Sequence, residues 1–199
     1  MRREAACVVL ALVAAVLAGC ANLEDVTLTP CEDEPGWVSR GSGEFGKVEE
    51  RQIYGVGSAF SSEKGDAATL AKKDARAELA KQLTAWVRAA NSRMSRELSE
   101  HFENGEKAAA SFFRQATGGV VSAAAERGEV RSRWMCEVTD EAYCLMAMTE
   151  ARVAAYYRKH VAEMAQKKKD MLKVKPEKFT TLLRKKGLTA GNPVGDLTK

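Results

Sequence analysis

The chain has 199 residues, a formal net charge of +4, and contents of 45% hydrophobic and 29% charged residues. Both contents are ordinary for a globular protein, so the composition argues against a chain too polar to bury a core. Without a signal segment, a linker and a tail, about 130 residues remain, which is enough for one domain with a sizeable core.

The amino terminus has the pattern of a secretory signal. Arg2 and Arg3 precede an apolar run of 12 residues from Cys7 to Ala18. That run is too short to span a bilayer, which takes about 20 residues, and it fits a cleaved signal peptide. It ends in Leu-Ala-Gly-Cys at Cys20, which resembles a bacterial lipobox.

The lipobox resemblance predicts where the protein is found. It implies that the Cys20 thiol carries diacylglycerol and that its amino group carries a further chain such as palmitate. Each buried methylene contributes about 0.8 kcal/mol, so several chains anchor a protein firmly. Because Ala21 and no aspartate follows Cys20, we expect a lipid anchor in the cell outer membrane, facing the periplasm. The alternative is an ordinary signal peptide with a chance cysteine.

Composition divides the chain into four parts. We expect a signal peptide at 1–19, an acidic tether at 20–35, an α+β domain at 36–166 and a basic tail at 167–199. Early in the domain, Gly41 to Gly46 matches the glycine spacing of dinucleotide-binding loops. That motif needs a strand before it and a helix after it, and neither is expected here, so we predict an ordinary loop.

A strand at Ile53–Phe60 and a helix at Asp66–Phe102 organise the domain. Gly55 and Gly57 lie on one face of the strand and leave a shallow trough, which often marks close approach of another backbone. The helix has one continuous apolar stripe. Its members are Ala68, Ala71, Ala75, Leu79, Leu83, Trp86, Ala90, Met94, Leu98 and Phe102. We expect Ala71 and Ala75 to lie over the glycine trough.

This helix is longer than the strand beneath it. Its 37 residues span about 55 Å, against roughly 25 Å for the strand. We therefore expect a bend near Asn91-Ser92, or a distal half that contacts something other than the sheet. Met94, Leu98 and Phe102 either pack on the next helix or form a partner-binding arm.

The second half contains a predicted hairpin with two cysteines. Strands at 130–136 and 142–148 lie between helices at 106–125 and 150–169. A three-residue loop places Cys136 opposite Cys144 and favours a disulfide between them, whereas a two-residue loop places Cys136 opposite Tyr143 and prevents it. The alternative is two buried thiols that act as small hydrophobes. Cys31 stays unpaired in both cases, and two copies of the chain could be cross-linked through it.

The carboxyl-terminal part is basic. From Lys167 to Lys186, nine Lys and Arg residues stand against Asp170 and Glu177, a local net charge of +7. A short amphipathic helix begins at Pro176 within this stretch. The basic residues form a solvated helix end, or they attract anionic lipid headgroups or cell-wall polymer. We expect no binding to nucleic acid in the envelope.

Several of these motifs together resemble the twenty-kilodalton membrane-associated lipoprotein family (LPP-twenty type). They are the lipobox, Trp37 after Pro35, the strand Ile-Tyr-Gly-Val-Gly-Ser-Ala, the Ala-rich helix, and Trp134 followed by Tyr-Cys-Leu at 143–145. The resemblance covers roughly Trp37 to Thr149. It implies a small α+β domain in which a long amphipathic helix packs on an antiparallel sheet of about three strands, with further helices after it. It carries over no catalytic residues.

The residues themselves indicate no enzyme. His101 and His160 each stand alone on a predicted helix, and none of the usual metalloprotease, hydrolase or thiol-redox motifs is present. We predict no catalytic residue, cofactor or metal. The first function hypothesis is a non-enzymatic envelope module that binds other envelope proteins or itself through Tyr54 and Val56 or the distal helix. The second is a periplasmic small-ligand binder with a pocket between Trp37, Trp86 and Trp134.

Overall fold

The structure is a computed structural model that describes residues 31, 33–45, 51–60 and 64–186. The predicted signal peptide, Cys20 and most of the tether lie outside these residues. The helices are α2 (Gly36–Arg40), α3 (Lys64–Glu97), α4 (Gly105–Ala116), α5 (Val120–Glu126), α6 (Glu150–Lys167) and α7 (Pro176–Lys185). The strands are β1 (Gly43–Phe45), β2 (Gln52–Phe60), β3 (Glu129–Cys136) and β4 (Glu141–Thr149). No helix among the described residues is both long enough and apolar enough to cross a membrane.

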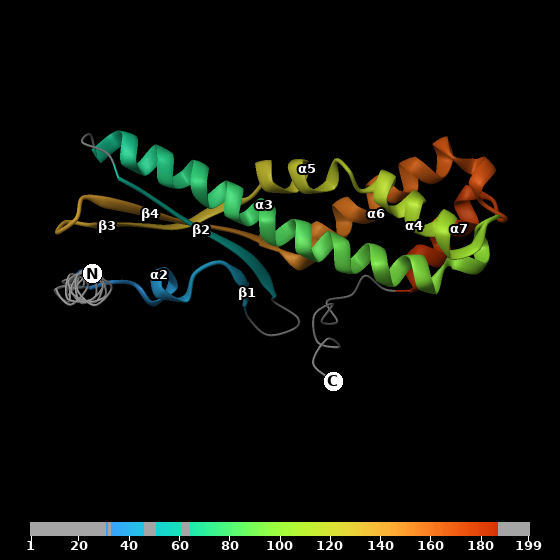
Figure 1. Ribbon diagram of the computed structural model, residues 1–199, viewed down its shortest axis with the longest axis horizontal. Coiled ribbons are helices and arrows are strands. Elements are labelled where there is room, and N and C mark those ends of the chain that lie inside the picture. The colour runs from blue at the N-terminus through green and yellow to red at the C-terminus, as the bar shows by residue number, and fades with distance from the viewer. Residues whose placement is uncertain (1–30, 32, 46–50, 61–63, 187–199) are drawn as a thin grey trace, which may run out of the picture. The chain divides into compact units, whose positions relative to one another are not determined.

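The predicted α+β class is confirmed. Three long strands and the short β1 form one antiparallel sheet in the order β1-β2-β4-β3, and α3 packs along one face of it (Figure 1). The prediction of a loop at 41–46 is wrong in part, because Gly43–Phe45 pairs with the start of β2, with Gly43 opposite Tyr54.

The predicted glycine trough is confirmed. Gly55 and Gly57 are buried beneath α3. A Cβ atom added at Gly55 would lie 2.7 Å from the Cα of Leu79, and one added at Gly57 would lie 2.7 Å from the carbonyl oxygen of Ala71. Because these neighbours are helix backbone, only glycine at both strand positions lets α3 approach this closely. Ala71 and Ala75 are fully buried over the trough, as expected.

The distal half of α3 packs on the other helices. The helix runs without interruption through Asn91-Ser92 for 34 residues, about 51 Å, so of the two predicted alternatives the distal half contacts something other than the sheet. Met94, Leu98 and Phe102 are fully buried, which confirms packing on the next helices and rules out the partner-binding arm. Phe102 lies 5.2 Å from Phe112 of α4 and 5.5 Å from Phe179 of α7, measured between ring centroids.

Helix α7, which we expected in a basic tail, contributes to this same core. Phe179 and Leu183 are fully buried, and Pro176 occupies the first turn of the helix, where its missing N–H costs nothing. The core therefore includes this last helix together with α3 and α4, while the basic residues of this region remain exposed.

The hairpin register differs from both predicted registers. The turn has four residues, Glu137 to Asp140, and Cys136 lies opposite Glu141. Asp140 adopts a positive φ of 55°, a conformation that aspartate tolerates better than most residues, so the turn needs no glycine. Cys144 pairs with Arg133 instead and points toward α3, on the opposite face of the sheet from Cys136.

The predicted Cys136–Cys144 disulfide is therefore wrong. The disulfide joins Cys136 to Cys31, whose Cα atoms are 5.6 Å apart across a sequence separation of 105 residues. Cys144 is a free, buried thiol, as in the alternative of small hydrophobic thiols, and burial raises its pKa. The odd cysteine of the sequence is Cys144 and not Cys31.

Candidate functional site

The sheet face opposite α3 carries a group of half-buried aromatic and aliphatic side chains. Since strands alternate their side chains, Tyr54 and Val56 of β2 share this face with Tyr143 and Leu145 of β4, because Val56 lies directly opposite Leu145. Trp134 of β3 lies opposite Tyr143, and their rings are 5.3 Å apart. We call these five residues the aromatic face.

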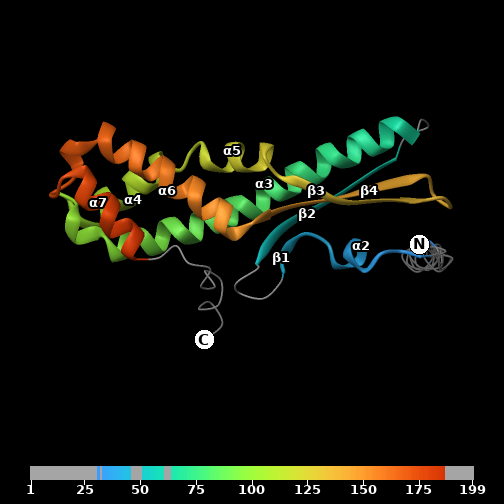
Figure 2. The same ribbon diagram turned by 180° about the vertical axis from the view of Figure 1, so that it is seen from behind.

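The amino-terminal segment crosses the aromatic face and is fixed at both ends. Figure 2 shows α2 on the side of the sheet away from α3, before the chain joins the edge of the sheet as β1. At one end Cys31 is bonded to Cys136. At the other end the Val56 N–H donates a hydrogen bond of 2.8 Å to the hydroxyl oxygen of Ser42, just before β1 pairs with β2. With this segment held beside them, the five side chains of the aromatic face remain half-buried.

A small cavity lies where this segment meets the sheet. Its volume is about 90 Å³, and its lining includes Trp37, Arg40, Tyr54 and Leu145. Pockets that hold typical small ligands measure about 300–1,000 Å³. Trp86 lies on α3, on the other side of the sheet, so the predicted pocket between three tryptophans does not form. The cavity does not favour the small-ligand hypothesis.

Tyr143 gives the aromatic face a polar centre. Its hydroxyl donates a hydrogen bond of 2.6 Å to Glu141. Burial, and after it this hydrogen bond, raises the pKa of the Tyr143 phenol to about 12. The phenol therefore stays protonated, and remains a hydrogen-bond donor, over the whole physiological pH range.

We predict a corresponding loss of stability in alkali. An ordinary tyrosine has a pKa near 10, so between pH 10 and 12 the unfolded state releases a proton that folded Tyr143 retains. Its contribution to stability is fully present below pH 10 and is lost as the pH rises toward 12. Urea unfolding at pH 9 and pH 11.5 should show a smaller alkaline loss for Tyr143→Phe than for the wild type, by up to about tenfold in the unfolding constant per pH unit. Equal losses would contradict this.

A buried polar cluster at the junction of sheet and helices has a structural role. Glu150 is 3% exposed, and one of its oxygens accepts a hydrogen bond of 2.9 Å from the Trp86 indole. Its other oxygen lies 4.0 Å from Nε of Arg51. Tyr157 packs edge-on against Trp86 and donates a hydrogen bond to Asn91. These contacts hold the end of the sheet to α3 and α6. Because the Glu150 carboxylate is buried, a substrate in solution cannot reach it.

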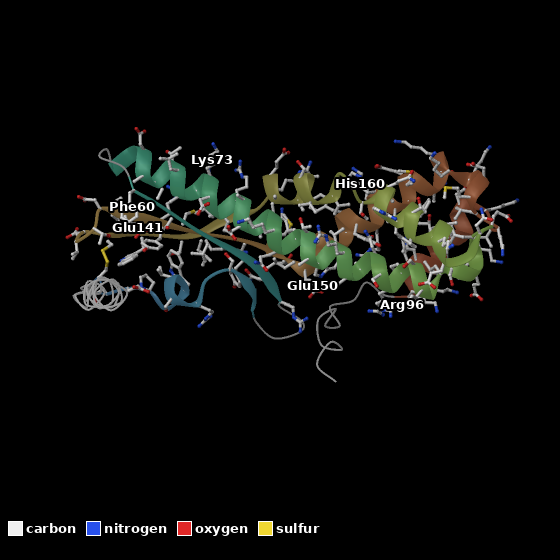
Figure 3. All side chains as sticks on the ribbon, viewed as in Figure 1. Phe60, Lys73, Arg96, Glu141, Glu150 and His160 are labelled. Carbon is white, nitrogen blue, oxygen red and sulfur yellow. A yellow bond between two sulfur atoms is a disulfide. The ribbon has the colours of Figure 1, made fainter. Side chains whose placement is uncertain are left out.

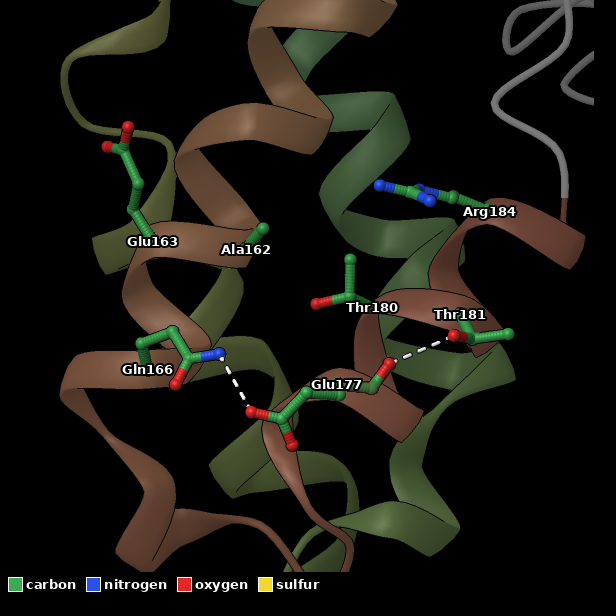
Figure 4. Close-up of a pocket in the computed structure, with 7 residues that line it drawn as sticks. All are labelled: Ala162, Glu163, Gln166, Glu177, Thr180, Thr181 and Arg184. Atoms are coloured by element: carbon green, nitrogen blue, oxygen red, sulfur yellow. Dashed lines mark hydrogen bonds between the residues drawn. The ribbon is translucent and has the colours of Figure 1, made fainter.

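A second hollow lies between α6 and α7 (Figure 4). Its volume is about 510 Å³, and it is open to solvent. Gln166 donates a hydrogen bond of 3.3 Å to Glu177 across it, and its walls also carry Glu163, Thr180 and Arg184. Ligand pockets are concave and mostly apolar, with a few convergent polar groups. An open groove with polar groups along both helices does not have that form.

The two histidines stay apart. Nε2 of His101 lies 3.4 Å from Glu100, and Nδ1 of His160 lies 3.8 Å from Glu163, each within one turn of its own segment. In the described part of the chain, no group of three or more His, Cys, Asp and Glu side chains is placed to hold a metal ion.

The residues that sequence reasoning missed are those of the amino-terminal segment. Trp37 was expected in a pocket with Trp86 and Trp134, and Ser42 in a loop, yet both lie against the aromatic face. After Cys20, three cysteines were available for pairing, so one of them had to stay free. This odd number was the signal that Cys31, and not Cys144, could be the partner of Cys136.

No family model matches the chain, and no curated protein or solved structure is significantly similar to it. The aromatic face is therefore interpreted from its own geometry. The resemblance to the twenty-kilodalton lipoprotein family stays a prediction.

Proposed function

We propose that the protein is a lipoprotein of the outer membrane, anchored through Cys20, whose α+β domain is a non-enzymatic interaction or assembly module of the cell envelope. On the motifs given above, we also propose kinship with the twenty-kilodalton membrane-associated lipoproteins. The domain would bind other envelope proteins, or a second copy of itself, through the aromatic face.

The Cys31–Cys136 disulfide is the observation that carries this proposal. Disulfides persist in oxidising compartments such as the bacterial periplasm and are rare in the cytosol. The bond thus supports export independently of the signal peptide. It also fixes the start of the described domain, from Cys31 to α2, beside the aromatic face.

Two surface features support an interaction role. Aromatic residues are enriched at protein interfaces because they combine large apolar area with a polar group, and the aromatic face has two tyrosines and a tryptophan. The nine Lys and Arg residues between 167 and 186 are all exposed and would suit an anionic envelope component.

The anchor is tested by replacing Cys20. We expect mass spectrometry of the wild-type protein to find an amino-terminal Cys20 with diacylglycerol attached. The Cys20→Ala variant should move almost entirely from the membrane fraction to the soluble fraction. Cys7→Ala, within the predicted signal peptide, is the matched control and should leave the protein in the outer membrane. An unmodified, uncleaved amino terminus would overturn the anchor.

The same cells test the aromatic face. Chemical cross-linking of intact cells should give discrete cross-linked species, each containing the protein with itself or with one envelope protein. We expect Tyr54→Ala to reduce these species several-fold. Tyr156→Ala, which removes a tyrosine of α6 that accepts a hydrogen bond from Arg127 and lies outside the sheet, should leave them unchanged. Equal cross-linking in all three proteins would contradict the proposed surface.

A further inference from the structure

Three large hydrophobic side chains are exposed among the described residues. Phe60 is 64% exposed, Val138 62% and Leu70 46%. Phe60 is the last residue of β2 and lies opposite Glu141, which in turn lies opposite Cys136, so all three share one end of the sheet (Figure 3). Val138 lies in the turn that follows Cys136. Leu70 lies in the second turn of α3, which follows β2 in the chain.

The chain from Cys20 reaches the domain at this same end. Neighbouring strands lie about 4.8 Å apart, so the Cα of Cys136 is roughly 10 Å from that of Phe60. Cys31 is bonded to Cys136, with 5.6 Å between Cα atoms. Cys31 follows Cys20 by eleven residue steps, and an extended chain spans at most about 3.6 Å per residue. A lipid on Cys20 would therefore keep this end within about 40 Å of the bilayer.

Charge separates the two ends of the domain. The nine basic residues between 167 and 186 lie on and around α7, whose carboxyl end lies beside the distal half of α3, where Arg93 donates a hydrogen bond to the Lys186 carbonyl. The end near Phe60 instead has exposed acidic side chains at Asp33, Glu34, Glu137 and Asp140. Attraction to anionic lipid would draw the α7 end to a membrane, so contact at the Phe60 end depends on apolar side chains and suits uncharged headgroups.

We propose that Phe60 and Val138 insert into the bilayer surface beside the lipid anchor, so that the turn between β3 and β4 faces the membrane and α7 points away from it. This inference rests on the proposed anchoring at Cys20. One phenylalanine and one valine bury too little apolar area to hold a domain on a membrane by themselves. A lipid anchor on a short tether makes their contact with the bilayer intramolecular and so raises their effective concentration at its surface. The disulfide fixes which end the tether holds.

Photo-cross-linking to lipid tests the orientation. The full chain is purified from membranes with its lipid and reconstituted into phosphatidylcholine vesicles. It is made with Phe60→benzoylphenylalanine, with Val138→benzoylphenylalanine, or with Thr181→benzoylphenylalanine as a matched control at an exposed position of α7. Circular dichroism checks that each variant is folded. We expect lipid adducts at positions 60 and 138 with yields at least tenfold above that at position 181.

The outcomes separate the two proposals. Equal lipid yields at the three positions, or adducts at 60 and 138 formed with protein and not with lipid, would overturn this orientation while leaving the anchor intact. The mass of the amino-terminal peptide is measured in the same samples. Its lack of an acyl group would overturn the proposed function, and this inference with it.

Discussion

Gly57→Ala is expected to destabilise the domain by about 3 kcal/mol or more, which would lower the melting temperature by roughly 10 °C. The added methyl group would lie 2.7 Å from the Ala71 carbonyl oxygen and 2.5 Å from the Asp74 carbonyl carbon. Both are backbone atoms of α3, so relief requires the whole helix to move off the sheet. Thermal unfolding followed by circular dichroism measures the change.

Gly65→Ala is the matched control for this substitution. Gly65 lies in the first turn of α3, and a Cβ atom there meets nothing within 4 Å. Alanine is favoured over glycine within a helix by about 0.5–1 kcal/mol, so this variant should be equal to or more stable than the wild type. If both variants unfold at the wild-type temperature, the close approach of α3 to β2 is wrong.

Removing the disulfide should have an effect of similar or larger size. The cross-link across 105 residues lowers the conformational entropy of the unfolded chain. The double variant Cys31→Ser/Cys136→Ser lacks it, so its unfolded state is more favourable. The chain-entropy estimate for a loop of about 100 residues is about 4.7 kcal/mol, within a usual range of 2–5 kcal/mol. Urea unfolding should shift to a lower midpoint by a corresponding amount. Reducing agent should shift the wild type likewise and leave the double variant unchanged.

Cys144→Ala controls for the loss of a thiol as such. Cys144 is buried and free, so its replacement removes one buried sulfur atom and should cost about 1 kcal/mol, with no change in sensitivity to reducing agent. Hydrogen exchange should localise the effect of the double variant. The amides around α2 should exchange faster. The Val56 amide, which donates a hydrogen bond to the Ser42 hydroxyl, should also exchange faster. A wild type insensitive to reductant would contradict the Cys31–Cys136 pairing.

The parts of the fold that the sequence predicted well depend on local periodicity. The apolar stripe of α3 repeats every three or four residues, and β2 alternates its faces, so each element and its buried face follow from neighbouring residues. Every member of that stripe from Ala71 through Phe102 is buried, whereas at its start Ala67 is buried and the predicted Ala68 is only half-buried. The glycine trough was also predictable, because Gly55 and Gly57 leave one strand face without side chains.

The aromatic face was predictable in part. Alternation places Tyr54 and Val56 together, but their neighbours Leu145 and Tyr143 depend on the pairing of β2 with β4. The covering segment with Trp37 depends on where the amino terminus is held, and no local pattern gives that. The distal half of α3 looked available for a partner in the sequence and is buried by helices that lie later in the chain.

The sequence by itself determined the long strand β2, the long helix α3 and the faces that they bury, whereas β1 and the division of the predicted helix 106–125 into α4 and α5 came from the structure. Only the tertiary structure decided the disulfide and the covered side of the sheet. The physical reason is register: with four residues in the turn, Cys136 and Cys144 point to opposite faces, and the partner of Cys136 comes from 105 residues away. Such long-range pairings depend on the whole packed domain, whereas the periodic patterns of helices and strands are set by residues close together in the sequence.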